Sequence, residues 1–212
     1  MQEKIIEMRL SEIVKFERSI ELASGMREII EYLGEQRIVE LDKVNIQILH
    51  CSQIHGVDHI NRVIVLGSLL AARENVSEND WIILLNALKY HDIGRINDKV
   101  DDSHGLRGAE LIRKLYERDF LKDEIKTKEE LDILCETVRL HSINDNYLSA
   151  VRNSNPRLYR IVSLLKDADN LDRVRLSDLD PRFLRSRNAV DMISFAEQLY
   201  RNYRLQKYLN KE

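Results

Sequence analysis

Proline and glycine are scarce in this chain, which has two prolines and seven glycines among 212 residues. Sandwiches and barrels of β-strands need many tight turns, and these turns depend on glycine and proline, so the composition argues against both. No apolar run approaches the ~20 residues of a membrane span, and the charged first ten residues contain no apolar signal region. A formal net charge of −3 gives no basic field for nucleic acid or membrane.

Cysteine is also rare, since the chain has only Cys51 and Cys135. The two residues lie far apart and neither belongs to a C-x-x-C motif, so we expect reduced, buried thiols rather than a disulfide framework. Together with the missing signal region, this usage predicts a cytoplasmic protein.

Apolar residues recur at helical spacing along most of the sequence. We predict helices over residues 4–32, with Gly25 and Gly34 as candidate breaks, over residues 44–72, and over residues 191–209. Three more apolar helical runs end at His91, at His141 and at Asp169. The chain therefore reads as a series of helices joined by short connectors.

Capping residues indicate where some of these helices begin and end. Ser77 with Asp80 and Thr127 with Glu130 have the spacing of a capping box. Asn155 precedes Pro156, which suits the first position of a helix, and Gly94 is predicted to end the helix that leads to His91.

We predict one all-α domain, because the sequence contains no internal repeat, low-complexity segment or linker. Within it, residues 1–43 would form an N-terminal helical cover, residues 44–176 the core, and residues 177–212 a C-terminal helical region. The apolar stripe of the cover could serve a monomer core or the contact of a homodimer.

Several potential metal ligands extend the apolar stripes of different predicted helices. His59, His141 and Asp169 each continue such a stripe, while His91 and Asp92 stand together at the end of a fourth run. A single histidine on an apolar face is more often a hydrogen-bonded core residue. A buried carboxylate is costly unless it is paired or coordinated, however, and four independent coincidences are improbable. The pattern therefore predicts a shared cation.

Three short segments resemble the H…HD…D signature of the HD-domain metal-dependent phosphohydrolases: HINRV at 59–63, HDIG at 91–94 and AD at 168–169. The resemblance spans roughly residues 54–176. It implies an all-α HD-domain helical bundle with a divalent metal bound by His59, His91, Asp92 and Asp169. It also implies cleavage of phosphomonoester, phosphodiester or pyrophosphate bonds, usually in nucleotides.

A second cation is suggested by further matches. The segment HGLRGA at 104–109 resembles the histidine-containing segment that follows the HD pair in two-metal members, and His141 falls where those members carry a His-His pair. Ser142 departs from that pair. In this arrangement Asp92 would bridge two ions, with His104 and His141 on the second. The ligand types do not distinguish Mn, Fe, Zn, Co, Ni or Mg.

Candidate catalytic and phosphate-binding residues surround these ligands. Asp92 and His55 are the predicted catalytic residues, and His55, expected on the same helical face as His59, would orient a ligand, contact phosphate or protonate the leaving oxygen. The candidates for phosphate binding are cationic, with ordinary solvated charge as the alternative for each: Arg95, Lys99, Arg62, Arg107 and Lys166.

The resemblance favours a hydrolase that uses a metal-activated water on a nucleotide or another small phosphorylated compound. The two-acid segment of alarmone hydrolases and the GYP segment of cyclic-di-GMP phosphodiesterases are both absent. One alternative is a non-catalytic nucleotide- and metal-binding signalling module of the same fold, which would bind nucleotide without hydrolysis. Another is an interaction scaffold with a structural metal, which would close its coordination shell with protein ligands. A nucleic-acid partner is not expected.

Overall fold

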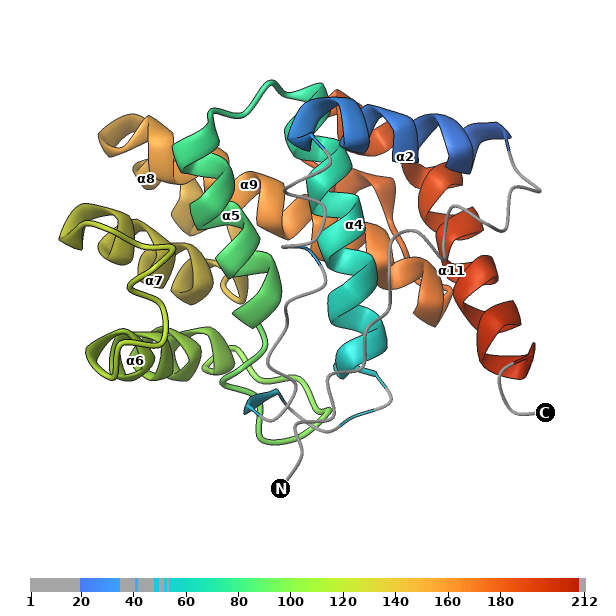
Figure 1. The fold of residues 1–212 in the computed structure, drawn as a ribbon. Helices are drawn as coiled ribbons and strands as arrows, with labels where there is room; N and C mark the ends of the chain where they lie inside the picture. The colour runs from blue at the N-terminus through green and yellow to red at the C-terminus, as the bar shows by residue number, and fades with distance from the viewer. Residues whose placement is uncertain (1–19, 35–40, 42–47, 50–51, 53, 210–212) are drawn as a thin grey trace.

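The computed structural model describes residues 20–34, 41, 48, 49, 52 and 54–209, and within this part of the chain it contains helices and no strand (Figure 1). The predicted all-α class is confirmed. The α-helices are α2 (Ile20–Leu33), α4 (Val57–Arg73), α5 (Glu78–Tyr90), α6 (His104–Glu117), α7 (Lys128–His141), α8 (Leu148–Ser154), α9 (Pro156–Leu171), α10 (Arg187–Val190) and α11 (Ile193–Leu209). Short 3₁₀ turns are η2 (Asp145–Tyr147), η3 (Asp172–Leu176) and η4 (Pro181–Phe183).

Helices α4, α5 and α9 form the middle of the bundle. Helix α4 packs against both α5 and α9, and α7 packs against α5 and α9. Figure 1 shows α6 and α7 on one side of this middle, and α2 and α11 on the other. The apolar residues of the three central helices are almost entirely buried, as Leu66, Leu84 and Val162 illustrate. The hydrophobic core therefore lies between these three helices.

Three predicted helix starts are found where the sequence placed them. The Ser77 hydroxyl accepts the amide N–H of Asp80 at 3.3 Å at the start of α5. Thr127 and Glu130 form a full reciprocal capping box at the start of α7. The Asn155 side chain caps α9, and Pro156 takes its first position.

The start of α4 differs from the prediction of one helix over residues 44–72. Helix α4 begins at Val57, and residues 54–56 form a bend before it. The Ser52 hydroxyl accepts the amide N–H groups of Ile54 and His55, at 2.9 and 3.0 Å. This local side-chain contact competes with helix formation. His55 therefore lies ahead of the helix and not on one helical face with His59; residues 42–47, 50–51 and 53 lie outside the described part.

Of the three glycines predicted to break or end a helix, one does so in the structure. Gly34 ends α2 in the left-handed region, with φ 72°, as predicted. Gly25 lies within α2 and does not break it, and an added Cβ there would overlap the ring of Phe195 on α11. Helix α5 ends at Tyr90 without a left-handed glycine, so the predicted capping role of Gly94 is wrong.

Residues 1–19, 35–40 and 42–43 of the predicted cover lie outside the described residues, as does Cys51. The described part, α2, packs on α4 and α11. Cys135 is a free, buried thiol on α7.

Candidate metal centre

The candidate ligands lie at the ends of five helices, which meet at one end of the bundle. His59 lies in the first turn of α4, and His91 follows the last residue of α5, with Asp92 next to it. His104 begins α6 and His141 ends α7. Asp169 lies in the last turn of α9. Figure 1 shows α4 beginning at the end of the bundle where α5 stops.

One oxygen of Asp92 faces the first ligand group, which consists of His59, His91 and Asp169. His59 Nε2 lies 3.2 Å from His91 Nε2 and 3.4 Å from Asp169 Oδ1. Asp92 Oδ2 lies 3.7 Å from His59 Nε2 and 3.6 Å from His91 Nε2. Two donors that each bind a cation at about 2.1 Å stand ~3.0–3.4 Å apart at tetrahedral or octahedral angles. These spacings therefore fit one shared ion with modest adjustment.

The other oxygen of Asp92 faces the second ligand group, His104 and His141. Asp92 Oδ1 lies 3.2 Å from His104 Nε2 and 3.8 Å from His141 Nε2. The two imidazole Nε2 atoms are 2.9 Å apart. The carboxylate of Asp92 is thus placed between the two groups, with one oxygen toward each.

Hydrogen bonds at Nδ1 define the tautomer of all four imidazoles. His91 Nδ1 lies 3.1 Å from the Leu88 carbonyl and His141 Nδ1 lies 2.6 Å from the Val138 carbonyl. His104 Nδ1 contacts the carbonyl of Asp101, while His59 Nδ1 lies 2.7 Å from Asp172 Oδ2. Carbonyl and carboxylate oxygens only accept, so each Nδ1 carries the hydrogen and donates it.

Each neutral ring therefore presents the lone pair of Nε2 to the centre. Burial lowers the pKa of His59 and of His141, which favours their neutral forms. Facing lone pairs of two imidazoles repel one another unless a cation lies between them, and neutral imidazole with carboxylate is a typical ligand set for Zn, Mn or Fe. The residues fit a divalent cation in the first ligand group and supply donors for another in the second.

The two carboxylates are held in the ionised form that a cation requires. Burial alone would raise the pKa of Asp92, but positive charge shared with the imidazoles of His91, His104 and His141, whether from a proton or from a cation between them, lowers it well below its usual range. Burial likewise opposes the shift at Asp169, and positive charge shared with His91 and His59 lowers its pKa to about 2. Both groups are therefore ready ligands at neutral pH.

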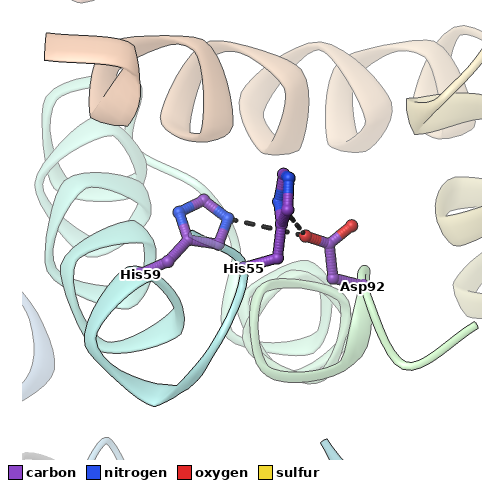
Figure 2. Close-up of side chains that lie close together, drawn as sticks. All are labelled: His55, His59 and Asp92. Carbon is purple, nitrogen blue, oxygen red and sulfur yellow. Dashed lines mark hydrogen bonds and ion pairs between the residues drawn. The ribbon is translucent and has the colours of Figure 1, made fainter. Parts of the chain in front are cut away.

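His55 contacts the same carboxylate from the open side. Figure 2 shows His55 and His59 both directed at Asp92. His55 Nδ1 lies 3.0 Å from Asp92 Oδ2, and the His55 side chain is 14% exposed. The bend before α4 therefore brings His55 to Asp92 although the two histidines do not share a helical face.

Among the predicted phosphate-binding residues, Arg95 is the one that touches a candidate ligand. Its Nε donates to Asp92 Oδ1 at 2.8 Å. Lys99 is exposed, and its backbone carbonyl accepts from the Arg95 guanidinium at 3.4 Å. Arg107 instead binds the Gly94 carbonyl and Asp101. The loop after the HD pair thus brings one guanidinium to the centre.

Arg62 and Lys166 are placed differently from the expectation of a phosphate contact. Arg62 is buried and donates to both carboxylate oxygens of Asp172, at 2.6 and 2.9 Å. Lys166 is buried, contacting Asp145 at 2.8 Å and the Ile143 carbonyl at 2.6 Å. Helix faces alone do not reveal which carboxylate a cation will meet, so both side chains are better described as structural ion-pair partners.

Sequence reasoning missed Asp172, which lies 1% exposed against His59. Its signal was present, because Asp172 follows Asp169 by three residues and such spacing places both on one helical face. The Ser142 hydroxyl donates to the Asp102 carbonyl at 2.9 Å, so the residue that departs from the His-His pair serves a backbone contact.

One of three comparisons with known proteins gives a match. The family model described as the HD domain matches residues 56–174, which is more than half of the chain. Comparisons with curated proteins and with solved structures found no match. In the part of the chain that the structure describes, no helix has both the length and the apolar character needed to cross a membrane.

Proposed function

The chain belongs to the HD-domain family, and from this premise we propose that it is a metal-dependent phosphohydrolase acting on a nucleotide or another small phosphorylated compound. The observation that carries the proposal is the convergence of four Nε2 lone pairs on the two oxygens of Asp92. Three ligand sets of suitable spacing overlap at this point. A bundle that needed histidine only for packing would have no reason to direct these lone pairs together.

Phosphate chemistry suits a centre of this composition. A divalent cation held by the first ligand group would lower the pKa of water and neutralise charge on a transferring phosphoryl group. Asp92 would contribute to both ligand groups, because one of its oxygens faces His59 and His91 and the other faces His104 and His141. Because a metal-activated water would be the nucleophile, no side chain of the centre would need to form a covalent bond with the substrate.

His55 and Arg95 are the residues proposed to meet the substrate. His55 uses Nδ1 on Asp92 and keeps part of its ring exposed, so its Nε2 is available to a leaving oxygen. Arg95 donates to the other oxygen of Asp92. On leaving that contact, its planar guanidinium would donate two parallel hydrogen bonds to phosphate oxygens. Lys99, exposed four residues later, would add a point charge.

The exposure of the centre favours an enzyme over a structural metal. The Asp169 side chain is 35% exposed, whereas His59, His91 and Asp92 are almost fully buried. A structural site usually surrounds its ion with four protein ligands, while a catalytic one keeps a position open to solvent. Access beside Asp169 and His55 supports the catalytic alternative.

The proposal is tested with protein freed of metal and reloaded separately with Mn²⁺, Co²⁺, Ni²⁺ or Mg²⁺. Bound metal is measured first, and each form is then offered nucleoside mono-, di- and triphosphates and cyclic and linear phosphodiesters. We expect release of phosphate or nucleotide with at least one ion. Nucleotide binding without turnover by every loaded form would instead identify a signalling module, and the hydrolase assignment would be abandoned.

A further inference from the structure

The imidazole of His59 is held between two carboxylates from one stretch of chain. Asp169 Oδ1 lies 3.4 Å from Nε2 of the ring, and Asp172 Oδ2 lies 2.7 Å from Nδ1. Asp169 is in the last turn of α9 and Asp172 begins η3, three residues later. Residues three apart share one helical face. The end of α9 therefore contacts both nitrogens of His59.

Asp172 is itself fixed by two arginines, the buried Arg62 and the partly buried Arg175. Arg62 Nε donates to Oδ1 at 2.6 Å and its Nη2 donates to Oδ2 at 2.9 Å. Arg175 Nη1 donates to Oδ2 at 3.2 Å and also to the Asp172 carbonyl at 3.0 Å. Arg62 is one turn beyond His59 on α4, so α4 and η3 are joined at this carboxylate. Its orientation cannot change without breaking several buried contacts.

The same cluster reaches the turn that carries His55. Arg175 Nε donates to the Ile54 carbonyl at 3.2 Å. Ile54 immediately precedes His55, whose ring contacts Asp92. Arg175 thus links Asp172 to the bend before α4.

We propose that Asp172 is the positioning residue of the metal centre: it accepts the Nδ1 proton of His59 and, held by Arg62 and Arg175, fixes the ring with its Nε2 lone pair toward the cation. The inference rests on the metal centre of the proposed function. Asp172 has its own carboxylate engaged by His59 and arginine, so it acts through His59.

The physical reason is the cost of orienting a free imidazole. An imidazole without a fixed acceptor at Nδ1 populates the other tautomer and other ring orientations, and both remove the lone pair from the cation. A carboxylate acceptor prevents this and makes the ring more basic as a ligand. Loss of such a partner typically lowers metal affinity by about 10- to 100-fold.

The test compares Asp172→Asn with the matched control Asp167→Asn. Asp167 is also 1% exposed and also binds an arginine, accepting from the amide of Arg185 at 2.9 Å and from its guanidinium at 3.1 Å. Its other partner is the amide of Ser186 at 3.0 Å. An asparagine at 172 offers one acceptor oxygen to four donor nitrogens from three residues. The contacts of Asp167, in contrast, do not include a candidate ligand.

Co²⁺ affinity is measured by competition with a chelator, and the absorption bands of bound Co²⁺ report its imidazole ligands. We expect Asp172→Asn to lose affinity by about 10- to 100-fold with altered bands, and Asp167→Asn to keep the affinity and bands of the unchanged protein. Affinity for Asp172→Asn within threefold of the unchanged protein, with the same bands, would overturn the inference.

A second measurement needs no variant and so does not depend on how Asp172→Asn folds. In Zn²⁺-loaded protein with ¹⁵N-labelled histidine, we expect NMR to find the His59 proton on Nδ1, in a strongly downfield hydrogen bond. A proton on Nε2 would overturn the inference. Absence of Co²⁺ binding to the unchanged protein would overturn it together with the metal centre, whereas binding without turnover would defeat only the proposed hydrolase.

Discussion

Three of the four central imidazoles are oriented by their own backbone, and the fourth is oriented by a distant side chain. His91, His104 and His141 each donate Nδ1–H to the carbonyl three residues earlier. His59 donates to Asp172, which lies 113 residues away in the sequence. A local backbone acceptor and a long-range side-chain acceptor therefore favour the same tautomer, with the hydrogen on Nδ1.

The position of each histidine relative to its helix explains the difference. The last turn of a helix has carbonyls without intrahelical partners, so His91 and His141 find an acceptor beside them. His59 lies in the first turn, where amides rather than carbonyls are unpaired. The carbonyl three residues before it belongs to Gly56 and accepts the amide of Ile60 at 3.1 Å. His104, the first residue of α6, still reaches the loop carbonyl of Asp101, whereas His59, two residues inside α4, depends on tertiary structure for its acceptor.

The largest effect is expected when Asp92 is replaced, because the locally oriented histidines and His59 all face its carboxylate. Asp92 turns one oxygen to His59 and His91 and the other to His104 and His141. We expect Asp92→Ala to abolish both metal binding and turnover, because neither ligand group keeps its carboxylate. Bound metal is measured by elemental analysis and activity on the substrate found in the panel.

Asp102→Ala is the control for this substitution, since Asp102 is exposed in the loop before α6 and its backbone carbonyl, which Ser142 binds, is unaffected. Metal content and turnover should stay unchanged in Asp102→Ala. Turnover retained by Asp92→Ala would contradict the role assigned to Asp92.

A smaller effect is expected from Gly94→Ala, which tests whether local orientation is enough to place a ligand. An added Cβ at Gly94 would overlap the carbonyl oxygen of His104 and the amide nitrogen of Gly108, so the first turn of α6 would have to move. We expect the free energy of unfolding to fall by about 1–3 kcal/mol, as for other overpacked sites. Affinity should fall mainly for a cation in the second ligand group, since the His104 ring keeps its Asp101 acceptor but shifts as a unit.

Gly34→Ala is the comparison for backbone cost alone. Gly34 has φ 72° and nothing within 4 Å of an added Cβ, so alanine there strains the chain by ~1–2 kcal/mol without moving a ligand. Urea unfolding and metal titration of both variants separate the two effects. Equal metal affinity in the two variants would show that α6 tolerates displacement.

The same division between local and long-range interactions explains which features could be predicted from the sequence. The all-α class and the caps at Ser77, Thr127 and Asn155 are local properties, and the structure confirms them. Convergence of the candidate ligands followed from apolar stripes that end at His91, His141 and Asp169. The partners of buried charges could not be predicted this way, because a pairing such as Arg62 with Asp172 spans 110 residues and leaves no periodic signal. The late start of α4 was missed because the Ser52 hydroxyl competes with the helix.

The smallest expected effect concerns Cys135, which lies six residues before His141 on α7. Burial raises the pKa of its thiol to about 11, so below that pH the reactive thiolate is a small fraction and becomes appreciable only as pH rises toward 11. If His141 is oriented by its own helix, removal of metal should not open α7. In a Cys51→Ser variant, which leaves Cys135 as the single thiol, we therefore expect equally slow reaction with a thiol reagent at pH 8 before and after treatment with a chelator. Much faster labelling after chelation would mean that the cation holds α7 in place, and that the local hydrogen bond of His141 depends on the metal.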